Sequence, residues 1–195
     1  MTDAFQPFIR LLKQLVTLTP TDETLIRTLF EPISYAKSTL LVEPGKVASY
    51  IYFINDGFAR AYHYEDGNEI TNHLGAPTGF ITAYLSFSTK TPSDEAVETL
   101  TPAQLLRITK DNLDQLYRQS HNLALFGIVM ADQYLVFNNQ RSRDLITLSA
   151  EQRYQKLMQE TPVLLQHIPL QYIASYIGVT PESLSRIRRK RPVNG

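Results

Sequence analysis

The chain has 195 residues, of which 43% are hydrophobic and 19% are charged. This composition supplies enough apolar side chain for a buried core and too little charge bias for a disordered protein. Because the chain has no cysteine, disulfides, thiolate metal sites, iron–sulfur clusters and cysteine nucleophiles are excluded. No stretch reaches about 18 consecutive apolar residues, so we expect a soluble cytoplasmic protein with no membrane segment.

The formal net charge of zero conceals an uneven distribution along the chain. Residues 168–195 carry five basic residues and one acid, a net charge of +4, so the remainder carries −4. A basic end on an acidic body is the asymmetry expected when one part of a protein binds a polyanion. A basic tail that only keeps the terminus soluble is the alternative.

Two short helices and a strand-rich region are expected before residue 110. Apolar residues at helical spacing predict helices over residues 5–16 and 21–30, the second with Thr21 as its N-cap. Between residues 33 and 109, runs of β-branched and aromatic residues alternate with turn dipeptides, with no helix expected between them. Strands are predicted at 50–54, 58–64 and 69–74, the last two joined by a hairpin turn at Asp66-Gly67. This pattern favours an antiparallel barrel or jelly roll.

Helical periodicity returns over residues 111–119, 122–145 and 150–160, with Ser149 as the N-cap of the third helix. The helix at 122–145 is apolar on nearly every face and must therefore be covered from more than one side. A second copy of the chain is the expected cover on one side, and a central core helix of a monomer is the alternative. The predicted dimer contacts are Leu123, Phe126, Met130, Tyr134 and Phe137.

Residues 170–187 fit the template of a helix-turn-helix motif. The small Ala174 allows the two helices to cross closely, and Gly178 supplies the sharp turn between them. The matching positions are Ile173, Ala174, Ile177, Gly178, Val179, Leu184 and Ile187.

The second helix of this motif carries the predicted DNA contacts. Thr180 is a suitable N-cap, and Pro181 stands at the first helical position. Glu182 is placed to accept a hydrogen bond from cytosine N4, and Arg186 to donate to guanine O6 and N7. A surface ion pair between these two residues is the alternative. The full set of candidate DNA contacts is Thr180, Pro181, Glu182, Ser183, Ser185, Arg186, Arg188, Arg189 and Lys190, with Arg191 as a further phosphate contact.

Several short motifs follow one another along the chain in an order typical of one protein family. They are Leu41-Val42-Glu43-Pro44-Gly45, Tyr50-Ile51-Tyr52-Phe53-Ile54, Gly57, Tyr62, Asp66-Gly67 and the run from Tyr172 to Arg188. In this order they resemble the CRP/FNR family of bacterial transcription regulators.

That resemblance implies an α+β fold with three parts. Residues 1–120 would form an antiparallel β jelly-roll sensor domain of the cyclic-nucleotide-binding type, residues 121–147 a long dimerisation helix, and residues 148–195 an all-α helix-turn-helix domain. The implied function is a homodimeric, sequence-specific DNA-binding transcription regulator that acts in the cytoplasm and is not an enzyme. Its expected partners are double-stranded DNA and a second copy of the chain, with RNA polymerase and an unidentified small-molecule effector as further candidates.

The chain departs from the family pattern where cyclic nucleotides are bound. Family members that bind them use a Gly-Glu pair for the ribose and an Arg-Ser pair for the phosphate. Here the matching stretches are Gly79-Phe80-Ile81-Thr82-Ala83, which has no acid, and Ser93-Asp94. A buried phosphate beside Asp94 without a cationic partner is unfavourable, so we expect a degenerate pocket that does not bind cAMP. Its expected lining is Phe80, Thr82, Tyr84, Ser93, Asn138 and Asn139, and a pocket filled by side chains is the alternative.

Two further departures concern DNA binding. The arginine, glutamate and arginine that read DNA in the family match Pro181, Glu182 and Arg186, so the first contact is lost. The chain also stops four residues after Arg191, without the full β-hairpin wing expected in the family. Loss of wing contacts would weaken DNA binding and flatten its salt dependence, and the basic cluster at residues 188–191 is placed to compensate.

Two other functions stay open. A metal-dependent enzyme of the cupin type would have to use His63, Glu65 and His73, which lack a His-x-His pair. The four histidines stand alone in the sequence, so we expect neither a metal nor a haem or other cofactor. A partner-binding adaptor that has lost DNA binding would account for Pro181 and the missing wing.

Overall fold

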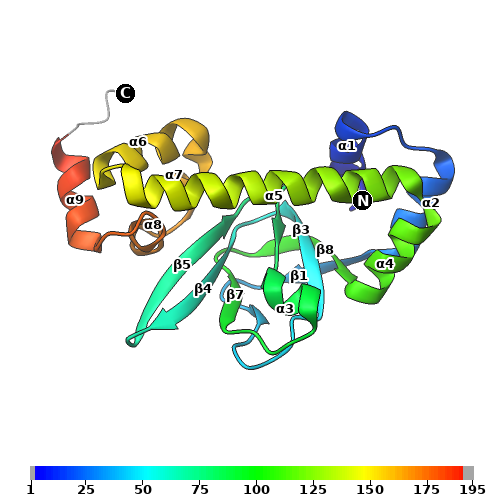
Figure 1. Cartoon of the computed structure of the whole chain (residues 1–195), viewed down its shortest axis with the longest axis horizontal. Coiled ribbons are helices and arrows are strands. Elements are labelled where there is room, and N and C mark those ends of the chain that lie inside the picture. The colour runs from blue at the N-terminus through cyan, green and yellow to red at the C-terminus, as the bar shows by residue number, and fades with distance from the viewer. Residues whose placement is uncertain (1–2, 191–195) are drawn as a thin grey trace.

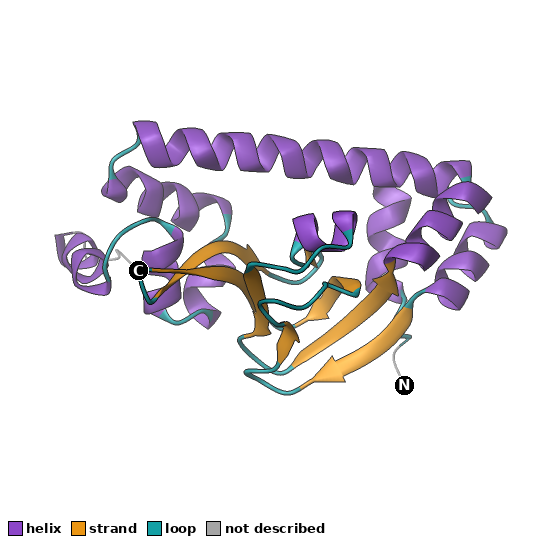
Figure 2. Ribbon diagram, turned by 60° about the horizontal axis from the view of Figure 1, so that its bottom comes forward, coloured by secondary structure: helices purple, strands orange, loops and turns teal. Residues whose placement is uncertain are grey.

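A computed structural model describes residues 3–190 and shows two antiparallel sheets flanked by helices (Figures 1 and 2). The first sheet has the order β1 (Glu31–Tyr35), β8 (Ala103–Thr109), β3 (Tyr50–Asp56) and β6 (Phe80–Ile81). The second has the order β2 (Leu40–Val42), β7 (Glu95–Thr99), β4 (Ala59–Glu65) and β5 (Asn68–Gly75). Every neighbouring pair is antiparallel, which confirms the predicted jelly-roll class.

The hairpin between β4 and β5 turns where the sequence predicts it. Asp66 has φ of 49° and Gly67 has φ of 79°, so both residues take the left-handed conformation that a two-residue hairpin turn requires. The three strands predicted individually lie within β3, β4 and β5, except that Phe58 precedes β4.

The prediction of no helix in the strand region is wrong, because α3 (Tyr84–Thr89) lies between β6 and β7. This short helix is fixed by contacts distant in sequence. Ser86 Oγ accepts from the Ala48 N–H at 2.9 Å and donates to the Thr91 carbonyl at 2.6 Å. Phe87 is buried in the core between the sheets. A helix of six residues is too short to show helical periodicity.

Strand β3 is buried on both faces. Tyr52 and Ile54 point into the core between the sheets, whereas Phe53 faces a helical layer. That layer consists of α1 (Gln6–Leu15), α2 (Pro20–Leu29), α4 (Lys110–Gln119) and the first half of α5 (His121–Thr147). Phe8 of α1 lies at its centre, with ring centroids 4.8–5.9 Å from Phe30, Phe53, Phe80 and Phe126.

The predicted N-cap of α2 is wrong by two residues. Thr19, not Thr21, caps the helix, and its Oγ1 accepts the Asp22 N–H at 3.2 Å. Asp22 in turn accepts the Thr19 N–H at 2.9 Å, which completes a capping box. Pro20 takes the first helical position, where its missing N–H costs nothing.

The remaining helices, α6 (Ala150–Glu160), α7 (Pro162–His167), α8 (Leu170–Tyr176) and α9 (Pro181–Lys190), follow the long helix α5. Ser149 caps α6 as predicted, in a capping box with Gln152. The hydrophobic core of these helices continues onto the β-domain through Phe58, Leu74 and Leu100. The predicted absence of a wing concerns the chain after residue 190, outside the described residues. Within residues 3–190, no helix combines the length and apolar character needed to cross a bilayer.

Candidate nucleic-acid interface and effector cavity

The turn between α8 and α9 forms as the helix-turn-helix template predicts. Gly178 has φ of +71°, and its N–H donates to the Ser175 carbonyl at 3.0 Å. The Val179 N–H donates to the Ala174 carbonyl at 2.9 Å, so the end of α8 has the two bonds of a Schellman motif. A side chain at residue 178 would be strained in this conformation, which explains the glycine.

Helix α9 begins at a polar N-terminus. Thr180 acts as its N-cap, because Thr180 Oγ1 accepts the Ser183 N–H at 3.3 Å. The pKa of Glu182 is lowered, first by a hydrogen bond from its own backbone N–H and then by the Thr180 hydroxyl. Arg186 Nη2 donates to Ser183 Oγ at 3.1 Å, which directs the guanidinium toward the first turn of the helix. The residues expected to read bases therefore lie together at the start of α9.

The outer face of α9 is open to solvent. Its buried side is formed by Leu184, which packs in the core with Ile173, Ala174 and Ile177 of α8. Among the predicted DNA contacts, the exposed residues are Thr180, Pro181, Glu182, Arg186, Arg188 and Arg189, and the half-buried ones are Ser183 and Ser185. The side chain of Lys190 and all of Arg191 lie outside the described structure. The sequence thus predicted a face that the fold assembles, while its contact with DNA stays a prediction.

Helix α5 presents two different apolar faces. Leu123 is 1% exposed and Phe126 is 6% exposed, because both pack into the protomer's own core against α1 and β3. Met130 also packs against that core. The prediction that Leu123 and Phe126 form a dimer contact is therefore wrong, since neither side chain is accessible to a partner. Tyr134 and Phe137 are exposed at their outer edges, and their rings contact Tyr84 and His73 respectively.

Four of the apolar side chains left exposed on α5 form another stripe. Ile128 is 58% exposed, Leu135 60% and Ile146 85%. Together with Leu125 these residues are separated by 3, 7 and 11 positions, which fits one register of a heptad repeat. We name Leu125, Ile128, Leu135 and Ile146 the α5 stripe.

A cavity of about 340 Å³ lies between α3, the start of β7 and α5. It is lined by Tyr84, Leu85, Ser88, Thr89, Asp94, Glu95 and Tyr134. Tyr84 is in this lining as predicted, and the other five predicted pocket residues lie elsewhere.

The predicted pocket residues that do not line the cavity make other contacts or lie outside it. Phe80 belongs to the aromatic cluster around Phe8, and Thr82 Oγ1 donates to the Tyr50 carbonyl at 2.8 Å. Ser93 is buried, and its Oγ donates to the Glu95 carbonyl at 2.8 Å. On α5, Asn138 is half-buried and Asn139 is exposed, both outside the cavity. Sequence position alone did not indicate these local hydrogen bonds and ring contacts.

The wall of this cavity is acidic. Asp94 is exposed, and the neighbouring Glu95 is half-buried. Burial raises the pKa of Glu95, and Asp94 raises it further, while the hydrogen bond from Asn72 lowers it. The cavity residues include no lysine, arginine or histidine among those described. Such a wall opposes an anionic ligand.

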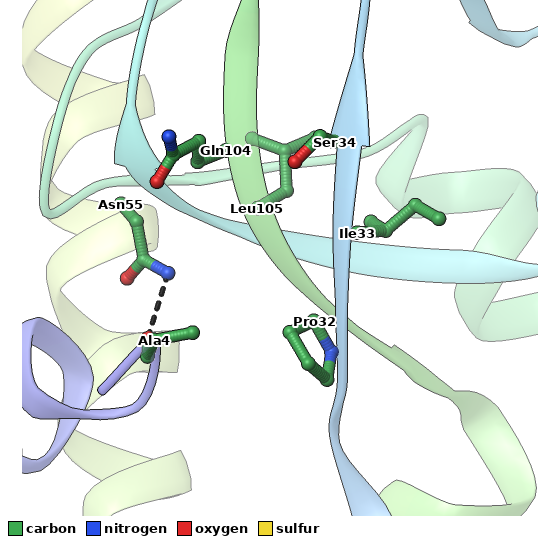
Figure 3. Close-up of a pocket in the computed structure, with 7 residues that line it drawn as sticks. All are labelled: Ala4, Pro32, Ile33, Ser34, Asn55, Gln104 and Leu105. Carbon is green, nitrogen blue, oxygen red and sulfur yellow. Dashed lines mark hydrogen bonds between the residues drawn. The ribbon is translucent and has the colours of Figure 1, made fainter. Parts of the chain in front are cut away.

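A second cavity, of about 210 Å³, lies beside β1 and β8 (Figure 3). Figure 3 shows Asn55 donating from Nδ2 to the Ala4 carbonyl, a distance of 2.8 Å. The other lining residues are Pro32, Ile33, Ser34, Gln104 and Leu105, so no charged side chain of the described structure lines it. This cavity offers nothing that would pair with an ionic ligand.

The residues that would serve a metal-dependent enzyme do not meet in a ligand set. No three histidine or acidic side chains of the described residues are arranged to hold a metal ion. His73 contacts Phe137 edge-on, with ring centroids 5.5 Å apart. Its pKa is lowered to about 4, first by burial and then by nearby Arg141.

Sequence reasoning missed one group of residues between the β-domain and α8. Arg60 of β4 and Arg141 of α5 stack on Tyr172 and Tyr176, and Ser175 bonds the backbone of β5. The four-residue spacing of the tyrosines is visible in the sequence, because it puts both rings on one face of a helix. The arginines that they meet are 112 and 35 positions earlier, and only the fold brings them close.

The architecture defines a class: a jelly-roll domain joined by a long helix to a helix-turn-helix. The family model described as "Cyclic nucleotide-binding domain" matches residues 32–120, so this part of the chain is similar to that domain. The chain as a whole has the fold of solved CRP/FNR-type regulators, which confirms the fold that the resemblance implies.

Three solved structures illustrate that fold. FixK2 from Bradyrhizobium japonicum aligns with a TM-score of 0.71 at 17% identity, covering 83% of this chain and 84% of that one. The c-di-GMP-responsive global regulator CLP of Xanthomonas campestris aligns with a TM-score of 0.67 at 18% identity, over 88% and 91% of the two chains. A putative CRP/FNR-family regulator from Eubacterium rectale aligns with a TM-score of 0.66 at 17% identity, over 91% and 85%. No curated protein sequence matches the chain.

Proposed function

We propose that this protein is a homodimeric, sequence-specific DNA-binding transcription regulator of the CRP/FNR type, and not an enzyme. The observation that carries the proposal is the exposed face of α9, where Glu182 and Arg186 lie in the first two turns behind a capped N-terminus. A recognition helix presents this part to base edges in the major groove. The expected place of action is the cytoplasm.

The proposal is tested by selecting DNA from a random duplex pool with the wild-type protein. We expect a pseudo-palindrome whose half-sites are about one helical turn apart. Arg186→Ala should weaken binding to the selected duplex about 10- to 100-fold, because a bidentate arginine–guanine contact contributes about 1–3 kcal/mol. The matched control is Arg10→Ala, an exposed arginine on α1. Selection of no duplex would refute DNA binding and favour the adaptor alternative.

The α5 stripe supports dimer formation. Four aliphatic side chains in a heptad register form an exposed apolar surface on one protomer, interrupted by Asp132, Asn139 and Ser142. A second α5 packed alongside would bury that surface, as in a two-stranded coiled coil. The predicted dimer contact thus moves from Leu123 and Phe126 to this stripe.

We further propose that the effector cavity does not accept cAMP. The cavity wall contributes Asp94 and Glu95 and no basic side chain, so a cyclic phosphate would lack a counter-charge. Titration calorimetry with millimolar cAMP should give no saturable heat. Saturable binding would overturn this part of the proposal and leave the DNA-binding part standing.

A further inference from the structure

Two arginine–tyrosine stacks hold helix α8, one against the β-domain and one against α5. The Arg60 guanidinium lies 3.6 Å from the ring centroid of Tyr172, and that of Arg141 lies 4.0 Å from Tyr176. In Figure 1, α8 lies between the C-terminal half of α5 and the β4–β5 hairpin, next to α9. The first helix of the DNA-binding motif is thus attached to both the sensor domain and the long helix.

The first stack is built around a buried cation. Arg60 is 1% exposed, and its guanidinium lies between the rings of Tyr62, at 3.9 Å, and Tyr172. Glu69 and Glu98 neutralise its charge, and Arg60 Nε donates to Glu98 Oε1 at 2.7 Å. Cation–π contacts strengthen when the cation is removed from water. A planar guanidinium between two rings also fixes the direction in which the Tyr172 ring lies.

The second stack joins α8 to α5. Arg141 Nη1 donates to the Tyr176 carbonyl at 2.8 Å, and its Nη2 donates to the Thr71 carbonyl of β5 at 3.4 Å. One side chain therefore links the long helix, the end of α8 and the edge of the second sheet.

Ser175 lies between the two tyrosines and closes the edge of the sheet. Strand β5 is at the edge of its sheet, where backbone groups lack a neighbouring strand. Ser175 Oγ accepts the Thr71 N–H at 2.8 Å and donates to the Glu69 carbonyl at 3.1 Å. Beside its apolar packing, α8 thus makes directional hydrogen bonds and stacks, which specify an orientation more strictly than apolar packing alone does.

We name Arg60, Arg141, Tyr172, Ser175 and Tyr176 the arginine–tyrosine latch. We propose that the latch fixes the orientation of α9 relative to α5, and thereby determines which half-site spacing the dimer accepts. This inference rests on the proposed function.

The geometric reason is a chain of rigid attachments. Helix α9 packs on α8 through Leu184 and Ile173, so it follows any rotation of α8. At the C-terminal end of α8, Arg153 of α6 connects this helix to the end of α5. Its Nε donates to the Ile177 carbonyl at 2.7 Å, and its Nη1 donates to the Leu148 carbonyl at 2.5 Å. A change of one base pair between half-sites moves the second site by roughly 3.4 Å and about one tenth of a turn. Two rigidly held recognition helices would therefore tolerate only one spacing.

The test variant replaces both rings by aliphatic side chains, Tyr172→Leu with Tyr176→Leu. Leucine keeps a high helix propensity and apolar volume but has no π face for the arginines. The matched control is Tyr172→Phe with Tyr176→Phe, which retains both rings. Urea unfolding of each variant establishes that it is folded before DNA binding is measured.

The probes are the duplex that wild type selects best from a random pool and derivatives with one base pair added or removed at its centre. We expect wild type and the phenylalanine control to lose about 100-fold in affinity on either change. The leucine variant should bind the best duplex about tenfold more weakly, because the helices must be ordered on binding. When the spacing is changed, the leucine variant should lose only about tenfold or less in affinity. An undiminished spacing penalty in the leucine variant would overturn the inference.

A measurement without DNA separates this inference from the proposed function. Because the chain has no cysteine, Tyr64→Cys on the hairpin and Arg189→Cys on α9 give one pair of spin-label sites in each protomer, and mixing with excess unlabelled protein leaves one labelled protomer per dimer. The distance between the labels should be narrowly distributed in wild type and in the phenylalanine control, and broad in the leucine variant. Equal distributions would refute the latch, whereas failure of wild type to select any duplex would refute the proposed function.

Discussion

The α5 stripe gives the sharpest prediction about assembly, through the double substitution Ile128→Ala with Leu135→Ala. Ile128 and Leu135 are 58% and 60% exposed on one protomer. Complete burial of such a side chain contributes about 1.5–3 kcal/mol. Burial of the exposed part of each side chain in the dimer would therefore contribute about 1–2 kcal/mol per residue. Counting both residues in both protomers, and allowing for the methyl that alanine retains, the variant should lose about 4 kcal/mol of dimerisation free energy.

That loss corresponds to a dimer Kd about 10³-fold higher. Sedimentation equilibrium over a range of concentrations measures it directly. Alanine favours the helix, so the fold of the protomer should survive the change.

The matched control is Leu123→Ala, on the opposite face of the same helix. Leu123 is 1% exposed within the protomer's own core, so its truncation should lower the free energy of unfolding by about 2–5 kcal/mol. Its dimer Kd should stay near that of wild type. If Leu123→Ala weakens the dimer more than the double substitution does, the assignment of the two faces of α5 is wrong.

Three further predictions concern the DNA face, the buried arginine and acid stability. Arg189→Ala, which removes an exposed cation from α9, should weaken binding to all duplexes alike and reduce the salt slope by about one, as measured by fluorescence anisotropy at several salt concentrations. A loss confined to one sequence would contradict a phosphate role. Arg60→Met should lower the free energy of unfolding in urea by about 3–5 kcal/mol, because Glu98 is left largely buried without its partner. A change below about 1 kcal/mol would contradict it. Asp22 is buried, and although burial opposes ionisation, hydrogen bonds from Ser120, Thr19 and Asn122 lower its pKa from 3.8 to about 2. The folded state therefore binds its proton less readily than the unfolded state, so a contribution of about 2 kcal/mol is present above pH 4 and is lost as the pH falls toward 2. Asp22→Asn should remove that part of the acid dependence of urea unfolding, and an unchanged dependence would refute it.

Local patterns in the sequence determined the class of fold and the helix-turn-helix. The turn at Asp66-Gly67 and the glycine at 178 depend on backbone conformations that only a few residue types adopt readily, and the cap at Ser149 depends on a hydroxyl that accepts a backbone N–H. Such features can be inferred from neighbouring residues alone. The exposed face of α9 follows for the same reason, because its buried and exposed positions alternate with the helical period.

The tertiary structure decided which surface each apolar or charged residue meets. Spacing identified α5 as apolar on several faces, but it could not tell the face with Leu123, which packs on the protomer's own phenylalanines, from the face with Leu135, which remains exposed. The lining of the cavity beside α3 differs from the predicted one for a similar reason, since Phe80 and Ser93 are taken up by contacts with residues elsewhere in the fold or by local hydrogen bonds.

No local pattern in the sequence could have predicted the arginine–tyrosine latch. Periodicity records how a segment divides into faces, whereas the partner of each face depends on how distant segments pack. The sequence by itself therefore determined a jelly-roll domain followed by a helix-turn-helix whose second helix is basic. Only the fold put Arg60 against Tyr172, because that contact joins residues 112 positions apart in the chain.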